Sequence, residues 1–343
     1  MSGSGTGVNI DIFHKLKREA RRCSPLIGLA VFYLAVTYLR EARYLKAYYI
    51  QVLMFGLINC MVTMGLNLIN GVTGQFSIGQ AGFVAVGAYS SAAVTTLLFR
   101  FNALPSIVRP LVFLLSILVA GIAAGVFGYL IGRPSLRVKG DYLAIVTLGF
   151  GEIIRAIIRL IPQVGGPRGF SGIPRYVNLA WILIFFALTI WFLRNYIYSA
   201  YGRACISCRE DDLAAETMGI NTTTYKVQAF IIGAVTAGVA GALLAHLLGY
   251  LHPDQFSYIR STDFLVYLYA GGAGTISGAV VGAMALTIVP EMLRFLSGWR
   301  LVIYGLVLVL MMLYRPHGIS NGKEFSFLVP RLAPKKTEEV QEG

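Results

Sequence analysis

The stretch GLNLINGVTGQFSIGQAGFVAVGAY, residues 65–89, interrupts a long apolar part of the chain with residues that weaken helices. It holds six glycines, two asparagines, two glutamines, a serine and a threonine. Glycine adopts backbone conformations that other residues avoid, and it destabilises a helix interior relative to alanine. Within a bilayer, irregular backbone is tolerated only where it is buried in protein or lines a water-filled cavity. The stretch therefore predicts a broken helix rather than an ordinary span.

The composition of the whole chain indicates a polytopic membrane protein. Of its 343 residues 56% are hydrophobic and 13% are charged, with a mean hydropathy of +0.68, whereas soluble domains carry about 25% charged residues. Apolar runs lie at 26–39, 47–69, 75–99, 109–132, 141–161, 178–198, 225–250, 263–291 and 299–314. Several approach the ~20 residues needed to cross a bilayer. Because backbone groups in lipid must pair within their own segment, we predict an all-α fold with about 8–10 transmembrane helices, some broken by glycine.

The distribution of basic residues predicts which loops are cytoplasmic. Segment 1–25 is basic and precedes the first apolar run, and no small-residue cleavage site follows that run, so we interpret it as a retained span. The organisation we predict is a cytoplasmic segment 1–25, a transmembrane permease domain 26–314 with a cytoplasmic loop at 199–224, and a cytoplasmic tail 315–343. Counting crossings places the tail inside only if 263–291 is more than one simple crossing. The glycines of AGGAGTISG, residues 270–278, supply the break.

This second glycine-rich stretch repeats the pattern of the first. GVTGQFSIGQAGFVAVGA at 71–88 and GGAGTISGAVVGA at 271–283 each place Gly-x-x-Gly in mid-membrane, then a serine and a glycine, then an apolar run that closes in Gly-Ala. Paired breaks in the two halves of a membrane chain indicate a transport site, because unwound backbone lines a cavity. Close packing of helices through small residues is the alternative interpretation.

Polar companions of the first break favour the pathway interpretation, because uncharged polar groups in hydrocarbon cost free energy unless they are partnered. Glu152 and Arg155 add charges one helical turn apart inside a span, where a functional role is the default hypothesis. A self-neutralising pair facing a neighbouring helix is the alternative, and it stays open. The predicted pathway residues are Asn67, Asn70, Gly71, Gly74, Gln75, Ser77, Gly79, Gln80, Glu152, Arg155, Gly271, Gly272, Gly274 and Ser277.

One polar cytoplasmic loop, YGRACISCREDDLAAETMGINTTTYK at 201–226, carries a dense set of charges. The piece 207–218 predicts a short helix that ends at Gly219 as its C-terminal cap. A short charged helix between two spans suits docking in a groove of another protein. Among its charges are Arg203, Arg209 and Asp211, and we predict that Arg209 and Asp211 make charged contacts at the rim of such a partner.

Other classes of function lack their motifs. There is no GxxxxGK[ST] phosphate loop, no HExxH and no catalytic-triad context, so we predict no enzyme active site, no metal site and no cofactor in this chain. The net charge of +13 is scattered between apolar segments and in the tails, which is typical of loops against anionic lipid and not of a nucleic-acid surface. Cys205 and Cys208 have CxxC spacing, which indicates either a thiol redox centre or, without a thioredoxin-like βαβ pattern, incidental small residues.

Five blocks of the sequence, in order, resemble a known family. GLNLINGVTGQFSIGQAGF, KGDYLAIVTLGFGEIIR, GGPRGFSGIP, GRACISCREDDLAAETMGI and YLYAGGAGTISGAVVGA look like blocks of the branched-chain amino-acid permease subunits of ABC importers, the LivM type. The resemblance covers about 47–320, most of the chain. One departure is Gln80, where many members of the family have histidine.

The charged loop also resembles the coupling loop of ABC importer permeases, whose general pattern is EAAxxxG. Ala214, Ala215 and Gly219 fit this pattern, and Leu213 stands where the first glutamate would be. The resemblance implies that these residues, with the charges named above, seat an ATPase subunit, and that the two alanines permit its close approach.

What the resemblance implies is a type II-like importer permease in a bacterial or archaeal cytoplasmic (inner) membrane. Its partners would be a related second permease subunit in a heterodimer, two ATP-binding cassette subunits that bind the ATP, and an external solute-binding protein. The implied solutes are branched-chain or other hydrophobic amino acids. The alternatives are a related importer of urea or short amides, an ion-driven secondary transporter or channel, which would need no docking loop, and a membrane thiol oxidoreductase.

Overall fold

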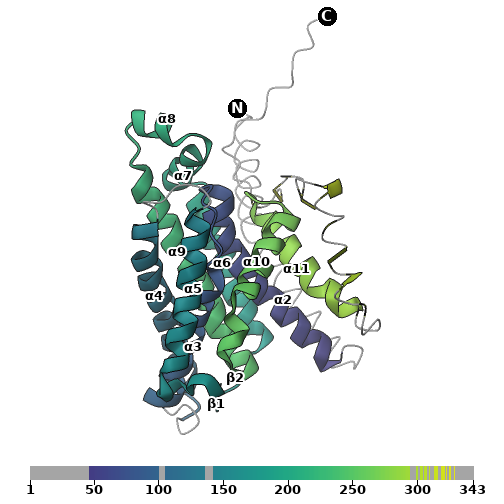
Figure 1. The fold of residues 1–343 in the computed structure, drawn as a ribbon. Coiled ribbons are helices and arrows are strands. Elements are labelled where there is room, and N and C mark those ends of the chain that lie inside the picture. The colour runs from purple at the N-terminus through teal and green to yellow at the C-terminus, as the bar shows by residue number, and fades with distance from the viewer. Residues whose placement is uncertain are drawn as a thin grey trace, which may run out of the picture. The chain divides into compact units, whose positions relative to one another are not determined.

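The computed structural model describes residues 46–99, 105–135 and 142–293, with scattered positions between 299 and 328. Within it, Ala47–Lys323 form one compact unit, drawn as the coloured ribbon of Figure 1. The predicted segment 1–25, the apolar run 26–39 and most of the tail 315–343 lie outside the described residues. The predictions for those parts therefore stay predictions.

The described chain is almost wholly helical. The long helices are α2 (Ala47–Leu66), α3 (Gln80–Ala93), α4 (Arg109–Ser135), α5 (Tyr142–Leu160), α6 (Leu179–Ile197), α9 (Thr222–Leu248), α10 (Tyr258–Gly271) and α11 (Ile276–Met292). Two short helices, α7 (Ala200–Glu210) and α8 (Asp212–Thr217), join α6 to α9. Helix α2 continues as a π-helix η1 (Asn67–Val72) and α3 as η2 (Val94–Leu98), and short 3-10 turns are η4 (Pro162–Val164), η5 (Gly166–Arg168) and η6 (Pro253–Phe256).

Five of these helices are long and apolar enough to cross a membrane: Ala47–Val72, Gln80–Leu98, Arg109–Ser135, Leu179–Ile197 and Thr222–Leu248. Helices α10 and α11 qualify only as a pair, and they are bent by 119° at their break. This confirms the predicted interruption of 263–291 at its glycines. Helix α5 has three charged residues and is not among the five. The predicted total of about 8–10 spans includes runs outside the described residues and stays a prediction.

Small residues of α9 let α3 and α4 pack closely against it. A Cβ on Gly238 would overlap Ala124 and the backbone of Ala120 on α4. Likewise a Cβ on Gly241 would overlap the backbone of Val84 on α3. Such close approach of backbones is how membrane helices associate where no hydrophobic driving force separates protein from lipid.

The two ends of the bundle differ in their elements. Figure 1 shows α7 and α8 at one end and the strands β1 (Phe170–Ser171) and β2 (Tyr250–Leu251) at the other. The strands pair antiparallel with Phe170 opposite Leu251. Because the loop 199–224 is predicted to be cytoplasmic, the β1–β2 end is the predicted outer end.

Candidate functional site

The first break separates η1 from α3. Asn70 bridges it, since its Nδ2 donates to the Ser77 carbonyl oxygen and its Oδ1 accepts from the Ser77 backbone nitrogen, each at 3.3 Å. Gly74 has a φ of +69°, a left-handed conformation that costs a residue with a Cβ roughly 1–2 kcal/mol. From α5, Thr147 Oγ1 accepts from the Ile78 backbone nitrogen at 3.1 Å. The break is therefore irregular but ordered, as glycine and asparagine permit.

The second break lies between α10 and α11. Gly272 and Gly274 have φ values of +114° and +89°. Thr275 begins α11, and its Oγ1 accepts from the Gly278 backbone nitrogen at 3.1 Å. The end of α10 is also paired from downstream, because the Ser320 backbone nitrogen donates to the carbonyl oxygen of Gly271 at 3.0 Å. Ser277, the predicted site residue of this stretch, lies 3.5 Å from Ser320 between hydroxyl oxygens.

The two breaks touch each other. Asn67 in η1 accepts with Oδ1 from the Gly274 backbone nitrogen at 2.7 Å and donates with Nδ2 to the Thr275 carbonyl oxygen at 3.1 Å. A Cβ on Gly71 would overlap the backbone nitrogen of Gly274. The repeat seen in the sequence is thus a pair of segments in direct contact, joined by one buried amide.

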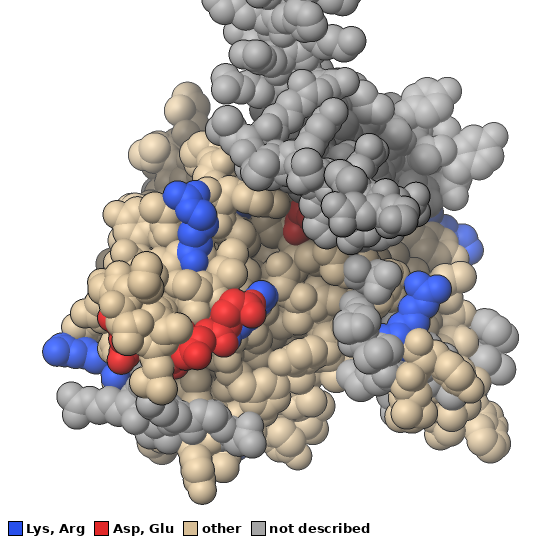
Figure 2. Space-filling view, turned by 90° about the horizontal axis from the view of Figure 1, so that it is seen from above, with Lys and Arg blue, Asp and Glu red and all other residues tan. Residues whose placement is uncertain are grey.

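Arg209 of α7 reaches the same place. Its Nη1 donates to the Gly71 carbonyl oxygen at 3.0 Å. A Cβ on Gly74 would lie 2.8 Å from Arg209 Cγ, and a Cβ on Gly274 would lie 3.4 Å from Nη1. Arg209 Nη2 also pairs with Glu210 Oε1 at 2.5 Å. The view onto the α7–α8 end shows acidic and basic side chains beside one another (Figure 2). Arg209, predicted as a rim contact for a partner, is therefore hydrogen-bonded to the first glycine-rich segment and lies close to the second.

The remaining polar residues of the first break are buried inside this chain. Gln80 Nε2 donates to the Gly233 carbonyl oxygen of α9 at 3.1 Å. Gln75 is buried, and neither of its amide atoms has a hydrogen-bond partner among the described residues. Gly79 lies against the backbone oxygen of Thr147. The structure thus collects these predicted pathway residues between helices of one chain, and their lining of a pathway stays a prediction.

The predicted single helix at 207–218 is wrong, because Asp211 divides the segment into α7 and α8. Asp211 has an extended backbone, and its Oδ1 accepts from the backbone nitrogens of Leu213 at 2.8 Å and Ala214 at 3.1 Å. A carboxylate at this position both caps a helix and interacts favourably with its positive end. Asp211, predicted as a rim charge, therefore uses one carboxylate oxygen within its own chain.

The end of α8 is as predicted. Gly219 has a φ of +80°, and the Ile220 backbone nitrogen donates to the Ala215 carbonyl oxygen at 3.1 Å, which confirms the glycine cap. Ala214 is exposed, but Ala215 is 4% exposed and packs inward. This corrects the predicted exposure of Ala215, whose small size lets α8 lie on its own chain. Arg203 is exposed and donates with Nη1 to the Tyr198 carbonyl oxygen at 3.2 Å.

The two cysteines of α7 are free and buried. Cys205 Sγ lies 3.7 Å from the Tyr196 hydroxyl oxygen. Burial raises the pKa of both the Cys205 and the Cys208 thiol. Since the thiolate is the reactive form, this environment favours the interpretation as packing residues over a redox centre.

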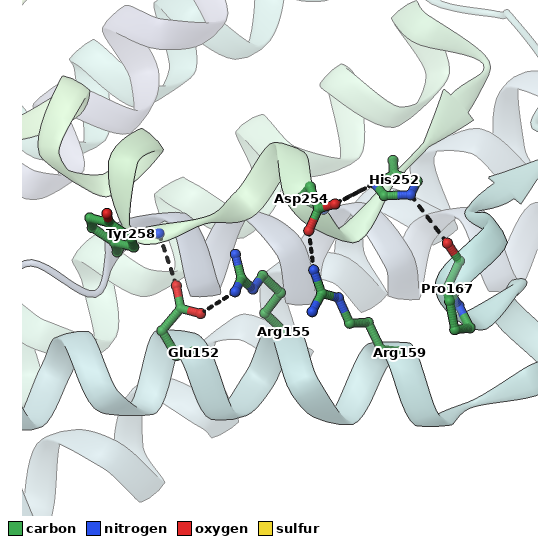
Figure 3. A network of polar contacts seen from close by, with 7 residues as sticks. All are labelled: Glu152, Arg155, Arg159, Pro167, His252, Asp254 and Tyr258. Carbon is green, nitrogen blue, oxygen red and sulfur yellow. Dashed lines mark hydrogen bonds and ion pairs between the residues drawn. The ribbon is translucent and has the colours of Figure 1, made fainter.

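Glu152 and Arg155 lie on α5 and point toward each other (Figure 3). Glu152 Oε2 pairs with Arg155 Nη2 at 2.7 Å, and Glu152 Oε1 accepts from the Tyr258 backbone nitrogen at 2.9 Å. That nitrogen begins α10 and has no partner within its helix. The pair therefore joins α5 to the start of α10, as the alternative of a helix-facing pair predicts; its pathway role stays untested.

A second group of polar contacts joins the loops at the predicted outer end. Arg159 pairs with Asp254, and His252 Nδ1 lies 3.4 Å from Asp254 Oδ2 (Figure 3). His252 Nε2 also lies 3.2 Å from the Pro167 carbonyl oxygen. These contacts join the end of α5 and the η5 turn to the segment before α10.

One charged cluster was missed from the sequence. Arg260 Nη2 donates to Asn59 Oδ1 at 2.8 Å, and Arg260 Nη1 lies 3.4 Å from Asp263 Oδ2. Asn59 Nδ2 in turn donates to Thr287 Oγ1 at 3.0 Å, and the Arg260 guanidinium carbon lies 4.9 Å from the centre of the Phe264 ring. The predicted apolar run began at 263, which left Arg260 in an outer loop. The available signal was the Arg-x-x-Asp spacing of a helical turn directly before that run.

Within the described ranges, no group of three or more His, Cys, Asp and Glu side chains is placed to hold a metal ion. What the structure does show is a bundle of membrane-length helices, two broken helices in contact, and a short charged helical segment tied to both breaks. These features define a multi-pass membrane transport protein. The chain belongs to the family described as branched-chain amino acid transport system / permease component, which matches residues 48–314.

Individual relatives agree with this assignment. The chain is 30% identical over 298 residues to the high-affinity branched-chain amino acid transport system permease protein LivM of Salmonella typhimurium, covering 77% of this chain and 68% of the relative. It is 28% identical over 309 residues to BraD of Pseudomonas aeruginosa, covering 81% and 97%. It is 27% identical over 289 residues to LivH of Salmonella typhimurium, covering 77% and 91%. No solved structure matches the chain significantly.

Gly74 offers a test of the first break. Gly74→Ala should reduce uptake and lower the melting temperature, because a Cβ there meets Arg209 Cγ at 2.8 Å in addition to the left-handed strain of roughly 1–2 kcal/mol. Gly172→Ala is the matched control, since Gly172 has a φ of +81° and nothing lies within 4 Å of its Cβ position. Equal melting temperatures and equal uptake in the two variants would contradict the proposed contact.

Gln75 offers a test of whether this arrangement is one state of a moving break. A buried polar group without a partner costs about 1–3 kcal/mol, so Gln75→Met should raise the melting temperature by favouring the present arrangement. If the break must open and hydrate this amide during transport, the same variant should slow uptake. Thermal unfolding and uptake are measured together, and a variant that is no more stable, or that transports normally, argues against the idea.

Proposed function

We propose that this chain is a permease subunit of an ATP-binding cassette importer, and that it forms the translocation pathway for branched-chain or other hydrophobic amino acids. The hydrogen bond of Arg209 to the Gly71 carbonyl oxygen, close to Gly274, carries this proposal, because it joins the segment suited to docking to the segments suited to transport. Family membership and the names of the relatives support the same function over import of urea or short amides and over ion-driven transport.

The proposed site of ATPase docking is the face of α8 that points away from the rest of the chain. Leu213 and Met218 are 71% and 82% exposed, and Ala214 lies between them without cover. Exposed apolar side chains on a short helix outside the spans are typical anchors for a groove in a partner. The opposite face of α8 is braced, since Ala215 is buried and Asp212 Oδ2 pairs with Lys226 Nζ of α9 at 2.5 Å.

Because α8 is short, a movement of the docked ATPase subunit that displaces α8 is transmitted to α7 through Asp211, whose carboxylate caps α8. At the end of α7, Arg209 then acts on the carbonyl oxygen of Gly71 and on the backbone around Gly74 and Gly274. Neither break has a continuous helical ladder, and segments of this kind move at lower free-energy cost than helix interiors. ATP hydrolysis in the docked subunits would thus reach both breaks through one side chain.

The partners follow from this division of labour. We propose that ATP is bound and hydrolysed by two ATP-binding cassette subunits, that this chain is not itself catalytic and needs no cofactor, and that an external solute-binding protein delivers the solute. Relatives named both LivM and LivH support a heterodimer of two related permease subunits. The proposed location is the cytoplasmic (inner) membrane of a bacterium or archaeon, with α7 and α8 inside.

The docking face can be tested by co-purification. Leu213→Glu with Met218→Glu should lower the yield of bound ATPase subunits about tenfold or more, the loss expected when an anchor worth over 1.4 kcal/mol is removed. Leu160→Glu is the control, because Leu160 is 79% exposed at the other end of the bundle. Unchanged recovery of the ATPase subunits with the double variant would show that α8 is not the docking element.

The link through Arg209 calls for a separate measurement. Arg209→Ala removes a charged hydrogen bond worth about 1.5–3 kcal/mol, and it should reduce uptake while the ATPase subunits still bind and hydrolyse ATP. Arg203→Ala, on the same helix, removes an exposed arginine whose side chain donates to the Tyr198 carbonyl oxygen in the α6–α7 turn, and it should transport normally. Uptake per ATP hydrolysed is the quantity to compare, and equal ratios in both variants would refute the link.

A further inference from the structure

The Arg260–Asp263 cluster lies near the middle of the membrane. Its depth follows from Asn59, the residue that holds the Arg260 guanidinium at 2.8 Å. Asn59 stands at the centre of the candidate span Ala47–Val72. The start of α10 is placed at a similar depth by Glu152, which accepts from the Tyr258 backbone nitrogen and lies in the middle part of α5. Helix α10 therefore begins inside the bilayer, and its first two turns carry two charges there.

The described residues do not fully enclose these charges. The side chains of Arg260 and Asp263 are 30% and 37% exposed, and Ile259, one helical turn before Asp263 on the same side of α10, is 59% exposed. Charged side chains in a bilayer face the interior of a protein assembly or a water-filled cavity, because exposure to hydrocarbon is expensive. This face of α10 is therefore not a lipid-facing surface.

Helix α4 shows what a lipid-facing surface of this chain looks like. Its exposed side chains include Leu111, Leu114, Leu118, Ile122, Val126 and Leu130. No charged residue lies between Leu111 and Leu130. The contrast between α4 and α10 separates two kinds of exposed membrane surface on one molecule.

We infer that the Arg260–Asp263 face of α10 lines the solute pathway and contacts the two charged groups of a zwitterionic amino acid. The guanidinium suits a carboxylate, to which it donates through a planar pair of N–H groups. The Asp263 carboxylate suits an ammonium group. Asn59 holds the guanidinium in place, and the 3.4 Å separation of Nη1 from Asp263 Oδ2 is a loose pair that leaves both groups available to a ligand.

This inference rests on the proposed transport function and names the part of the solute that the permease contacts. It also moves the pathway from the glycine-rich break, which is buried within the chain, to the open side of α10. An apolar side chain of the solute would lie toward Ile259, which is exposed one helical turn before Asp263.

The pathway is tested by cysteine labelling in membranes that hold the complete importer. In a background with the four native cysteines changed to Ser, Ile259→Cys should react with a charged, membrane-impermeant methanethiosulfonate at least about tenfold faster than Ile122→Cys. Ile122 is the matched control because it is 58% exposed, against 59% for Ile259, at the centre of the candidate span Arg109–Ser135. An Ile259→Cys variant that transports but stays as unreactive as Ile122→Cys would overturn the inference, showing a dry subunit interface.

The zwitterion is tested by protection of the same cysteine. L-leucine should slow labelling more than L-leucinamide, which lacks the carboxylate, and more than N-acetyl-L-leucine, which lacks the ammonium group. Adding Asp263→Asn should abolish the difference between leucine and N-acetylleucine but keep that between leucine and leucinamide. Asp254→Asn, which changes an aspartate paired with Arg159 at the outer end, should alter neither. Equal protection by all three compounds, when Arg260 and Asp263 are both present, would overturn the proposed recognition of the carboxylate and the ammonium group.

ATP-dependent uptake is measured on the same membranes, so the two proposals fail in different ways. Uptake that needs no ATP would refute the importer function whatever the labelling shows. Uptake that needs ATP, with no labelling or no charge-dependent protection, would leave the importer function intact and refute the role of Arg260 and Asp263.

Discussion

The contact between the two helix breaks is the constraint on which the arrangement of this molecule depends. Unwound backbone within a bilayer must find its hydrogen bonds in the protein, and here each break supplies partners for the other region. Asn67 pairs with a backbone nitrogen and a carbonyl oxygen of the second break, across 207 and 208 residues of sequence. Arg209 pairs with the carbonyl oxygen of Gly71. The end of α2, the bend between α10 and α11 and the position of α7 are therefore fixed by the same few polar groups.

Glycine makes this contact possible in two separate ways. At Gly74 and Gly274, glycine supplies the left-handed backbone that turns each of the two segments. At Gly71, the absence of a Cβ lets the two segments approach each other. The two interpretations of the repeat, close packing and a pathway, are thus not exclusive at the level of geometry. The packing is present in the structure, and a break that is held by side-chain hydrogen bonds rather than by a helical ladder is also the place where a conformational change needs to disturb least.

Local features of the fold could be predicted from the sequence, whereas the contacts between distant segments could not. The break in 263–291 and the cap at Gly219 follow from glycine chemistry within a few residues. The division of 207–218 by Asp211 was missed because aspartate is tolerated in a first turn and its capping role depends on the backbone conformation actually adopted. The inward direction of Ala215 depends on how α8 lies on α9, and the partnership of Asn67 with Thr275 depends on tertiary packing. Arg260 was assigned to a loop because a charged first turn lowers the hydropathy at the start of a helix, which makes the boundary of an apolar run a poor measure of depth.

The role of a charged pair in this protein depends on its depth in the membrane and on the groups around it. Glu152, Arg155, Arg260 and Asp263 occur as two pairs with the same i,i+3 spacing, yet their surroundings differ. Glu152 uses its second oxygen to satisfy the first backbone nitrogen of α10, so that pair has a structural task in the described chain. Arg260 is held by Asn59 at mid-span while its loose partner Asp263 remains more than a third exposed. A bilayer does not tolerate that exposure to lipid, and among the described residues the hydrogen-bond partner of Asp263 is Arg260 itself. Contact with water or solute at this face of α10 is the physical reason for assigning the solute to Arg260 and Asp263 and not to the buried glycines.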